Sequence, residues 1–326
     1  MAATTNLTAL GWDERVEDLY RAHPETGLTP GRVVRVDVDR CVVATTASTT
    51  TTAAAATLPV VGDWVLLETR PDADPAFAVA GVLERHGTLT RPSPDPAATD
   101  RVVAANIDVV GIVTGLDRPP NLRRLEREVV VASGGGARPM IVLTKADLHS
   151  EPDAATDEVG RHFPAVEVLV TNALEDDGVD ALARAVQPNL TLVLVGASGV
   201  GKSTLVNRLV GSELMTTNEV REGDRRGRHT TTARHLIVLP DGGVLIDTPG
   251  VRSVALSADP TGIAIAYDEI EEVATRCRFS NCRHQGEPGC AVAAAVVDGE
   301  LGSEGVARYL ELSDEAAERG VRKRRR

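Results

Sequence analysis

The stretch that decides the fold is Gly196-Ala197-Ser198-Gly199-Val200-Gly201-Lys202-Ser203. It fits the phosphate-binding pattern GxxxxGK(S/T) at every fixed position. The apolar run Leu190–Val195 precedes it and the helical pattern Thr204–Val210 follows, so the strand–loop–helix context of the motif is present. A glycine-rich turn after a strand can be merely a turn, but both flanks favour a phosphate loop here.

The residue types in this loop suit phosphate chemistry. Small side chains let backbone N–H groups approach phosphate oxygens, and the following helix adds the positive end of its dipole. We expect Lys202 to reach the β- and γ-phosphates and the Ser203 hydroxyl, next to Thr204, to bind Mg²⁺. The sequence therefore predicts a nucleotide site over residues 196–204.

Composition and charge limit the class of protein. The chain has 326 residues, of which 42% are hydrophobic, so it can bury several cores and is not disordered throughout. It has no apolar run near the ~20 residues that span a bilayer and no secretory signal pattern, so we expect a cytoplasmic protein with no membrane partner. The net charge of −12 argues against an overall electrostatic grip on nucleic acid, although the basic end Arg322–Arg326 leaves room for a local one.

Two later segments carry the remaining phosphate chemistry. Asp247-Thr248-Pro249-Gly250 follows the apolar run Val244–Ile246, and we expect Asp247 to hold Mg²⁺ and the Gly250 amide to sense the γ-phosphate. A threonine of the preceding segment 227–232 can close on Mg²⁺ when the γ-phosphate is present, but spacing does not decide which threonine. The candidate catalytic residues are His229, Thr230, Thr231, Asp247 and Gly250.

The base is indicated by Thr144-Lys145-Ala146-Asp147, which follows the apolar run Pro139–Leu143 and resembles the guanine-recognition motif of GTPases. A carboxylate there accepts hydrogen bonds from guanine N1–H and the 2-amino group, and adenine has neither donor. That family motif usually begins with Asn, so Thr144, with its shorter reach, is expected to weaken one contact to the base or to the phosphate loop. The matching loop one strand further on is assigned to Thr171–Leu174, where only Ala173 fits the family pattern.

The order of the motifs is unusual. Base recognition at 144–147 precedes the phosphate loop at 196–203, whereas ordinary small GTPases have the reverse order. The same sheet forms if the chain is circularly permuted. The segment that senses the γ-phosphate then runs directly into the C-terminal unit, which suggests that nucleotide state acts on whatever that unit binds.

Three units are expected. Residues 1–90 are predicted to form a short helix and an all-β, OB-like barrel, with Thr45–Thr57 as a mobile loop. Residues 91–255 are predicted to be an α/β P-loop GTPase domain, entered through a linker at Arg91–Asp100. Residues 256–326 are predicted to be a mainly helical zinc-binding domain with a frayed basic end from Arg319.

Three of the four cysteines crowd together with a histidine. The candidate metal ligands are Cys277, Cys282, His284 and Cys290. Three thiolates and one imidazole make a closed tetrahedral Zn²⁺ site without an open catalytic position, so the metal is expected to be structural. The alternative is a set of unrelated small buried cysteines.

Together these features resemble the ribosome small-subunit-dependent GTPases, a circularly permuted family. The resemblance covers nearly the whole chain and also includes Val61-Gly62-Asp63-Trp64-Val65 and Ala104-Ala105-Asn106-Ile107-Asp108. It implies an OB-fold, a permuted GTPase domain and a zinc domain, with the 30S ribosomal subunit and its 16S rRNA as partners that stimulate hydrolysis of GTP to GDP. It further implies late maturation of that subunit as the process, and we expect a monomer.

Val251 stands where many GTPases place a water-orienting Gln, so slow intrinsic hydrolysis is expected. His229 and Arg228 are candidates to help, although contact with rRNA or solvent is an equally good interpretation. Two other functions stay open. One is a different P-loop enzyme that uses ATP, and the other is an RNA-binding scaffold in which the nucleotide only stabilises the fold.

Overall fold

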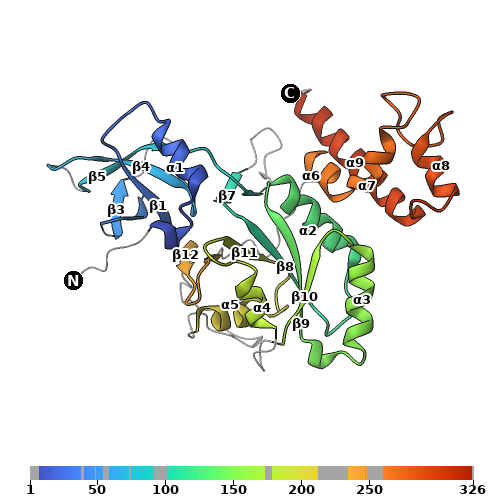
Figure 1. Ribbon diagram of the computed structural model, residues 1–326, viewed down its shortest axis with the longest axis horizontal. Helices are drawn as coiled ribbons and strands as arrows, with labels where there is room; N and C mark the ends of the chain where they lie inside the picture. The colour runs from blue at the N-terminus through green and yellow to red at the C-terminus, as the bar shows by residue number, and fades with distance from the viewer. Residues whose placement is uncertain are drawn as a thin grey trace, which may run out of the picture.

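The computed structural model describes residues 7–37, 40–47, 49–53, 59–72, 75–91, 101–172, 178–211, 234–247 and 260–324 (Figure 1). The strands of the N-terminal unit lie at one side, an α/β unit lies in the centre, and helices of the C-terminal unit lie at the other side. No helix in these ranges is both long enough and apolar enough to cross a membrane.

The central unit is a mixed sheet with helices on both faces. The strand order is β10-β9-β8-β11-β13-β12, and neighbours are parallel except for β12, which pairs antiparallel with β13. The strands are β8 (Val109–Gly115), β9 (Arg138–Thr144), β10 (Glu167–Val170), β11 (Thr191–Val195), β12 (Arg234–Val238) and β13 (Val244–Asp247).

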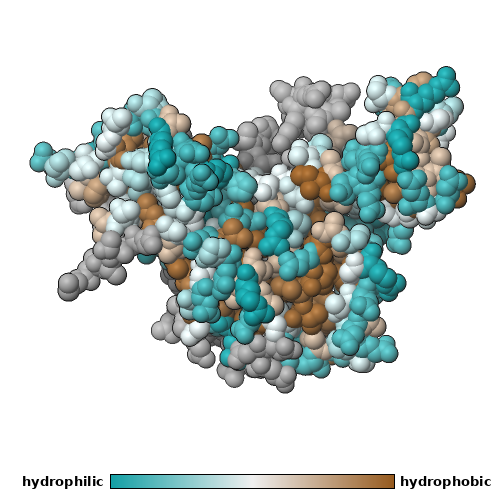
Figure 2. Space-filling model, in the orientation of Figure 1, coloured by the Kyte–Doolittle hydropathy of each residue, from teal (hydrophilic) through white to brown (hydrophobic). Residues whose placement is uncertain are grey.

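Two buried clusters hold helices on this sheet. One packs α2 (Leu122–Gly134) and α3 (Pro152–His162) on one face, and the other packs α4 (Val179–Arg184) and α5 (Lys202–Val210) on the opposite face. Helix α3 has no counterpart among the sequence-based expectations, because only Ala155 and Val159 of it are buried. In Figure 2, apolar side chains gather over the central strands, with more hydrophilic surface over α3 and the N-terminal unit.

The N-terminal strands close into a barrel. β1 pairs with both β2 and β4, β2 with β3, and β5 with both β3 and β4, so the five strands form a ring. Their bounds are Thr29–Val36, Arg40–Thr45, Thr49–Ala53, Trp64–Thr69 and Phe77–Val82 for β1 to β5. The short helix expected in the N-terminal unit is two pieces, a 3₁₀ turn η1 (Leu7–Leu10) and α1 (Glu14–Arg21), because Asp13 caps α1 by accepting from the Val16 N–H at 2.8 Å.

The prediction of a mobile loop over Thr45–Thr57 is wrong for Thr49–Ala53. This segment is strand β3, paired residue by residue with β2. The Thr52 side chain is fully buried, and its hydroxyl lies 2.8 Å from the Cys41 sulfur. Threonine is β-branched and fits a pleated, half-buried surface, so a run without large apolar residues still forms a strand when a partner strand is present.

The barrel joins the central sheet edge to edge. β1 pairs antiparallel with β12, with Arg35 opposite His235, so eleven strands form one continuous sheet. A separate two-stranded ribbon, β6 (Thr88–Arg91) and β7 (Arg101–Ala105), flanks the expected linker, whose residues 92–100 lie outside the described ranges.

A buried arginine ties these parts together. Arg32 on β1 is 1% exposed and donates to carbonyls of the N-terminal turn, the barrel and the central unit. Its acceptors are Leu10 O, Gly62 O at 3.2 Å, Asn106 O at 3.0 Å and Thr191 Oγ1 at 2.9 Å. Burial lowers the pKa of Arg32 to about 10, and the hydrogen bonds offset the cost of burying its charge.

The C-terminal unit is helical, as expected. It consists of α6 (Pro260–Ala266), α7 (Asp268–Ala274), α8 (Ala291–Val297) and α9 (Ser303–Arg324), which share one apolar core. Reciprocal ion pairs fasten α9 to α2: Arg308 to Glu126 at 2.6 Å and Arg127 to Glu315 at 2.5 Å. The prediction that the chain frays from Arg319 is wrong up to Arg324, because the helical backbone of α9 continues to that residue.

Candidate nucleotide site and metal centre

The phosphate loop lies between β11 and α5, as its sequence context predicts. Gly196 has φ +139°, and a Cβ there would lie 2.3 Å from Val113 O, so only glycine fits. Gly201 has φ +98° and caps α5, which begins at Lys202 and contains Ser203 and Thr204 in its first turn. The Lys202 ammonium donates to Gly196 O at 2.8 Å and to Ala197 O, so the lysine folds back over its own loop.

Thr144 links the base-recognition segment to the phosphate loop. Its side chain is 3% exposed, and its hydroxyl lies 2.6 Å from Val200 O and 3.3 Å from Thr114 O. Threonine in place of asparagine was expected to weaken one contact, to the base or to the phosphate loop, and the contact to the phosphate loop is present. The hydroxyl of the last residue of β9 thus joins the end of β8 to the loop that follows β11.

The rest of this segment lies at the carboxyl edge of the sheet. Lys145 adopts φ +58°, and its ammonium lies 3.3 Å from Asp117 Oδ2. Asp147 is exposed and belongs to the 3₁₀ turn η2 (Ala146–Leu148). Asp117 was missed by sequence reasoning, although a polar residue just after a buried strand at this edge is a detectable signal.

The remaining predicted nucleotide residues are only partly described. Asp247 ends β13, which pairs directly with β11, so it lies at the same sheet edge as the phosphate loop. Thr171 and Asn172 are buried, whereas 173 and 174 lie outside the described residues. His229, Thr230, Thr231 and Gly250 also lie outside the described residues.

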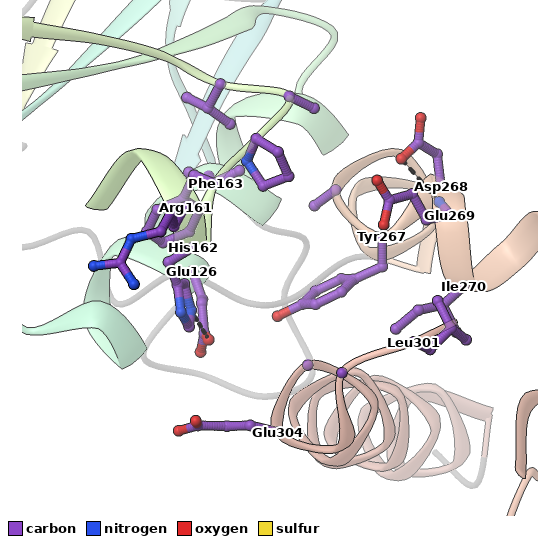
Figure 3. Close-up of a pocket in the computed structure, with 17 residues that line it drawn as sticks. Glu126, Arg161, His162, Phe163, Tyr267, Asp268, Glu269, Ile270, Leu301 and Glu304 are labelled. Atoms are coloured by element: carbon purple, nitrogen blue, oxygen red, sulfur yellow. Dashed lines mark hydrogen bonds and ion pairs between the residues drawn. The ribbon is translucent and has the colours of Figure 1, made fainter. Parts of the chain in front are cut away.

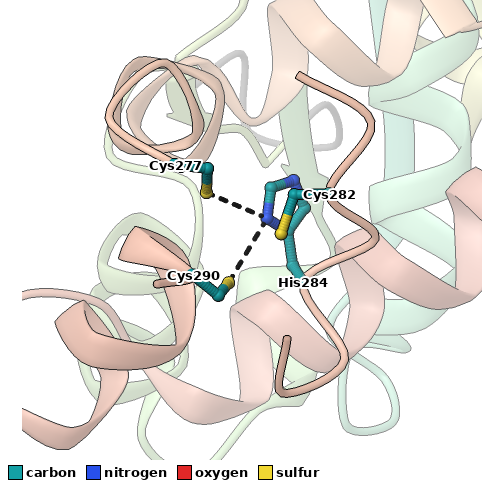
Figure 4. Close-up of side chains that lie close together, drawn as sticks. All are labelled: Cys277, Cys282, His284 and Cys290. Carbon is teal, nitrogen blue, oxygen red and sulfur yellow. Dashed lines mark hydrogen bonds between the residues drawn. The ribbon is translucent and has the colours of Figure 1, made fainter. Parts of the chain in front are cut away.

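The four predicted metal ligands come together. One donor atom from each of Cys277, Cys282, His284 and Cys290 lies within 4.8 Å of every other (Figure 4). His284 Nδ1 lies 3.5 Å from Cys277 Sγ and 3.6 Å from Cys290 Sγ. Ligands at the usual Zn–S and Zn–N bond lengths are about 3.6–3.8 Å apart in a tetrahedron, so these residues fit a tetrahedral metal.

Helix α8 supports the thiol side of this cluster. Ala291 N–H donates to Cys277 Sγ and Ala293 N–H to Cys290 Sγ, both at 3.3 Å. Burial opposes ionisation of Cys277, but donation from the backbone amides at the start of α8 outweighs it and lowers the pKa of that thiol. The lowered pKa favours the thiolate form of Cys277, which is the form that binds metal, whereas burial raises the pKa of the Cys282 thiol to about 11.

A cleft of about 280 Å³ separates the central and C-terminal units (Figure 3). Glu126 on its wall is 5% exposed and lies 2.7 Å from His162 Nε2 as well as 2.6 Å from Arg308 Nε. The Tyr267 hydroxyl points into the space near this pair, is buried, and has no hydrogen-bond partner among the described residues. Ion pairs hold the two units together, and at this cleft their side chains do not pack fully.

Known proteins are similar to this chain in sequence and in fold. A model of the RsgA GTPase family matches residues 82–257. The small ribosomal subunit biogenesis GTPase RsgA of Opitutus terrae is 39% identical, over 95% of this chain and 90% of the relative. The protein of that name from Streptomyces coelicolor is also 39% identical, over 95% of this chain and 86% of its own length.

Solved structures support the fold. YjeQ from Thermotoga maritima has a TM-score of 0.67 at 24% identity, covering 89% of this chain and 99% of that chain. YloQ, described as a circularly permuted GTPase, has a TM-score of 0.67 at 22% identity, covering 92% and 98%. The predicted fold class is confirmed: a permuted P-loop GTPase unit with an N-terminal barrel and a C-terminal helical unit that carries a metal-ligand cluster.

Proposed function

Because the chain belongs to the RsgA GTPase family, we propose that it hydrolyses GTP to GDP and phosphate while it assists biogenesis of the small ribosomal subunit. The family resemblance inferred from the sequence is confirmed. The observation that carries the proposal is the Thr144–Val200 hydrogen bond, because it joins a guanine-recognition segment to a phosphate loop.

The proposed roles follow from position. Lys202 exchanges the carbonyls of Gly196 and Ala197 for the β- and γ-phosphates, and the Asp147 carboxylate accepts from guanine. The Ser203 hydroxyl and the Asp247 carboxylate are oxygen donors of the kind Mg²⁺ prefers, so they would hold the ion that neutralises phosphate charge. The oxygen of a water molecule bonds to the γ-phosphorus while the bond between that phosphorus and the oxygen bridging to the β-phosphate breaks.

The zinc assignment is also a proposal. Cys277, Cys282, His284 and Cys290 offer three sulfurs and one nitrogen, a donor set typical of structural Zn²⁺. All four positions of a tetrahedron are then occupied by protein, so the ion would supply stability and no reaction step.

We propose that the three units of the chain have different roles. Residues 1–90 and 256–326 contact 16S rRNA of the 30S subunit, and 91–255 bind and hydrolyse GTP, with the chain acting as a monomer in the cytoplasm. The continuous sheet gives a physical route between barrel and nucleotide site, because β1 pairs with β12 and β12 pairs with β13, which ends at Asp247. The C-terminal unit follows 248–259 directly in the chain.

The test is GTP turnover by the full chain alone, with purified 30S subunits, and with 50S subunits as the matched control. We expect 30S subunits, and not 50S subunits, to raise GTP turnover by the chain strongly, within the ~10⁵-fold range that activators give GTPases. No stimulation by 30S subunits contradicts the proposal. Effective competition by ATP would favour a different P-loop enzyme, and GTP binding without hydrolysis would favour an RNA-binding scaffold.

The proposed catalytic role of His229 has a separate test. His229→Ala should lower 30S-stimulated turnover more than it lowers GTP affinity, because a catalytic group acts mainly in the transition state. Arg228→Ala is measured in parallel, because Arg228 is the other candidate to assist hydrolysis. An equal loss of turnover and affinity in His229→Ala would remove His229 from catalysis.

A further inference from the structure

We propose that Asp117 is a positioning residue of the guanine site, which holds the Lys145 ammonium so that the lysine stem forms one wall of the purine pocket. The inference rests on the proposed function, because it concerns the same nucleotide. It assigns a role to a side chain outside both nucleotide motifs.

The topology places Asp117 between those motifs. The strand order β9-β8-β11 puts β8 in the middle, with the base-recognition segment after β9 and the phosphate loop after β11. All three strands are parallel, so their carboxyl ends meet at one edge, where ligands bind in open α/β sheets. Asp117 follows the end of β8 at Gly115 and therefore lies at the centre of this edge.

The contact with Lys145 is specific. Lys145 Nζ lies 3.3 Å from Asp117 Oδ2, and the two side chains are only 30% and 25% exposed. Lys145 reaches this place from φ +58°, a backbone conformation that L residues seldom adopt. Room for the pair depends on Gly115, since a Cβ there would lie 2.5 Å from Asp117 Oδ1 and 3.4 Å from Lys145 Cδ.

The backbone on both sides of Asp117 is restrained. The neighbouring Leu116 is fully buried and its N–H donates to Thr144 O at 2.8 Å. Asn121, four residues after Asp117, caps α2, and its side chain accepts from Arg124 N–H at 3.0 Å. The segment between contains Pro119-Pro120, which restricts its backbone further. The lysine is thus paired with a carboxylate whose flanking backbone is restrained on both sides.

Holding the lysine matters for binding. A free lysine side chain loses rotamer freedom when a ligand packs against it, and an ordered one has lost it already. Lysine methylenes offer an apolar surface while the ammonium stays with its partner. Immobilising one such side chain is worth about two- to tenfold in affinity, which sets the size of the expected effect.

The experiment measures GDP affinity by calorimetry on the full chain and its variants. Asp117→Asn should weaken GDP binding about two- to tenfold, with an unchanged thermal midpoint. Arg118→Ala is the matched control, since Arg118 also lies 3.7 Å from Asp117 Oδ2 but its side chain is 81% exposed. Its GDP affinity should equal that of the wild-type chain, and an equal loss in this control would overturn the assignment to Lys145.

A double-mutant cycle tests whether Asp117 acts through Lys145. Lys145→Met keeps the stem and removes the charge, so adding Asp117→Asn to it should cause no further loss. Asp117→Asn should weaken binding of inosine diphosphate (IDP), which lacks the 2-amino group, by the same factor as binding of GDP, because Asp117 does not contact that group. Wild-type affinity in Asp117→Asn, additive losses, or a changed GDP-to-IDP ratio would overturn the inference. Failure of the wild-type chain to bind GDP would overturn the proposed function, and the inference with it.

Discussion

Thr144→Val tests the link between base recognition and the phosphate loop. Valine has nearly the same shape as threonine, so the change removes the hydroxyl without opening a cavity. Thr144 is 3% exposed and its hydroxyl contacts Val200 O at 2.6 Å, so the valine methyl group would face that carbonyl oxygen and leave it without this donor. A buried acceptor left unpaired costs about 1–3 kcal/mol. If the substitution destabilises the nucleotide-bound conformation of the phosphate loop by about 1–2 kcal/mol of that cost, the affinity for GDP drops about 5- to 30-fold.

The assay is GDP binding by calorimetry, with urea denaturation as a check on folding. Thr144→Ser is the matched control, because it keeps the hydroxyl and removes the methyl group. We expect the serine variant to stay within about threefold of the wild-type affinity. Wild-type affinity in Thr144→Val would refute the reasoning, and equal losses in both variants would assign the effect to methyl packing.

Three further variants test other parts of the structure. Arg32→Met leaves Leu10 O, Asn106 O and the Thr191 hydroxyl without this donor and should lower the free energy of unfolding by about 3 kcal/mol or more, measured by urea denaturation; a wild-type midpoint would contradict this. Burial raises the pKa of Glu128, so the folded state binds more protons and stability falls as pH rises above the ordinary carboxyl pKa; Glu128→Gln should lack this component, and unchanged pH slopes between pH 4 and 7 would argue against it. Cys290→Ser removes one of four proposed zinc ligands, so zinc content by mass spectrometry should fall well below one ion per chain, and full retention would count against the site.

Local motifs predicted much of this molecule. The phosphate loop and the base-recognition segment each need particular residues at fixed spacing, so the sequence places them correctly on β11–α5 and after β9. The Cys/His cluster is similar, since its ligands lie within one short stretch of chain. Motif order and these placements together predicted the permuted topology.

Features that depend on distant partners escaped sequence reasoning. Strand β3 is made of Thr and Ala, and its pairing with β2 supplies what its composition does not indicate. Arg32 looks like one arginine among many, but its acceptors come from positions up to 159 residues away along the chain. The role proposed for Asp117 depends on the strand order, which places β8 between the two motif-bearing strands.

The most direct test of the central claim compares ADP with GDP. The claim is that a permuted chain still builds one pocket in which the Asp147 carboxylate selects guanine. Calorimetry on the full chain should find ADP at least about a hundredfold weaker than GDP, because adenine leaves that carboxylate without a matching donor. Equal affinities for ADP and GDP would contradict the claim.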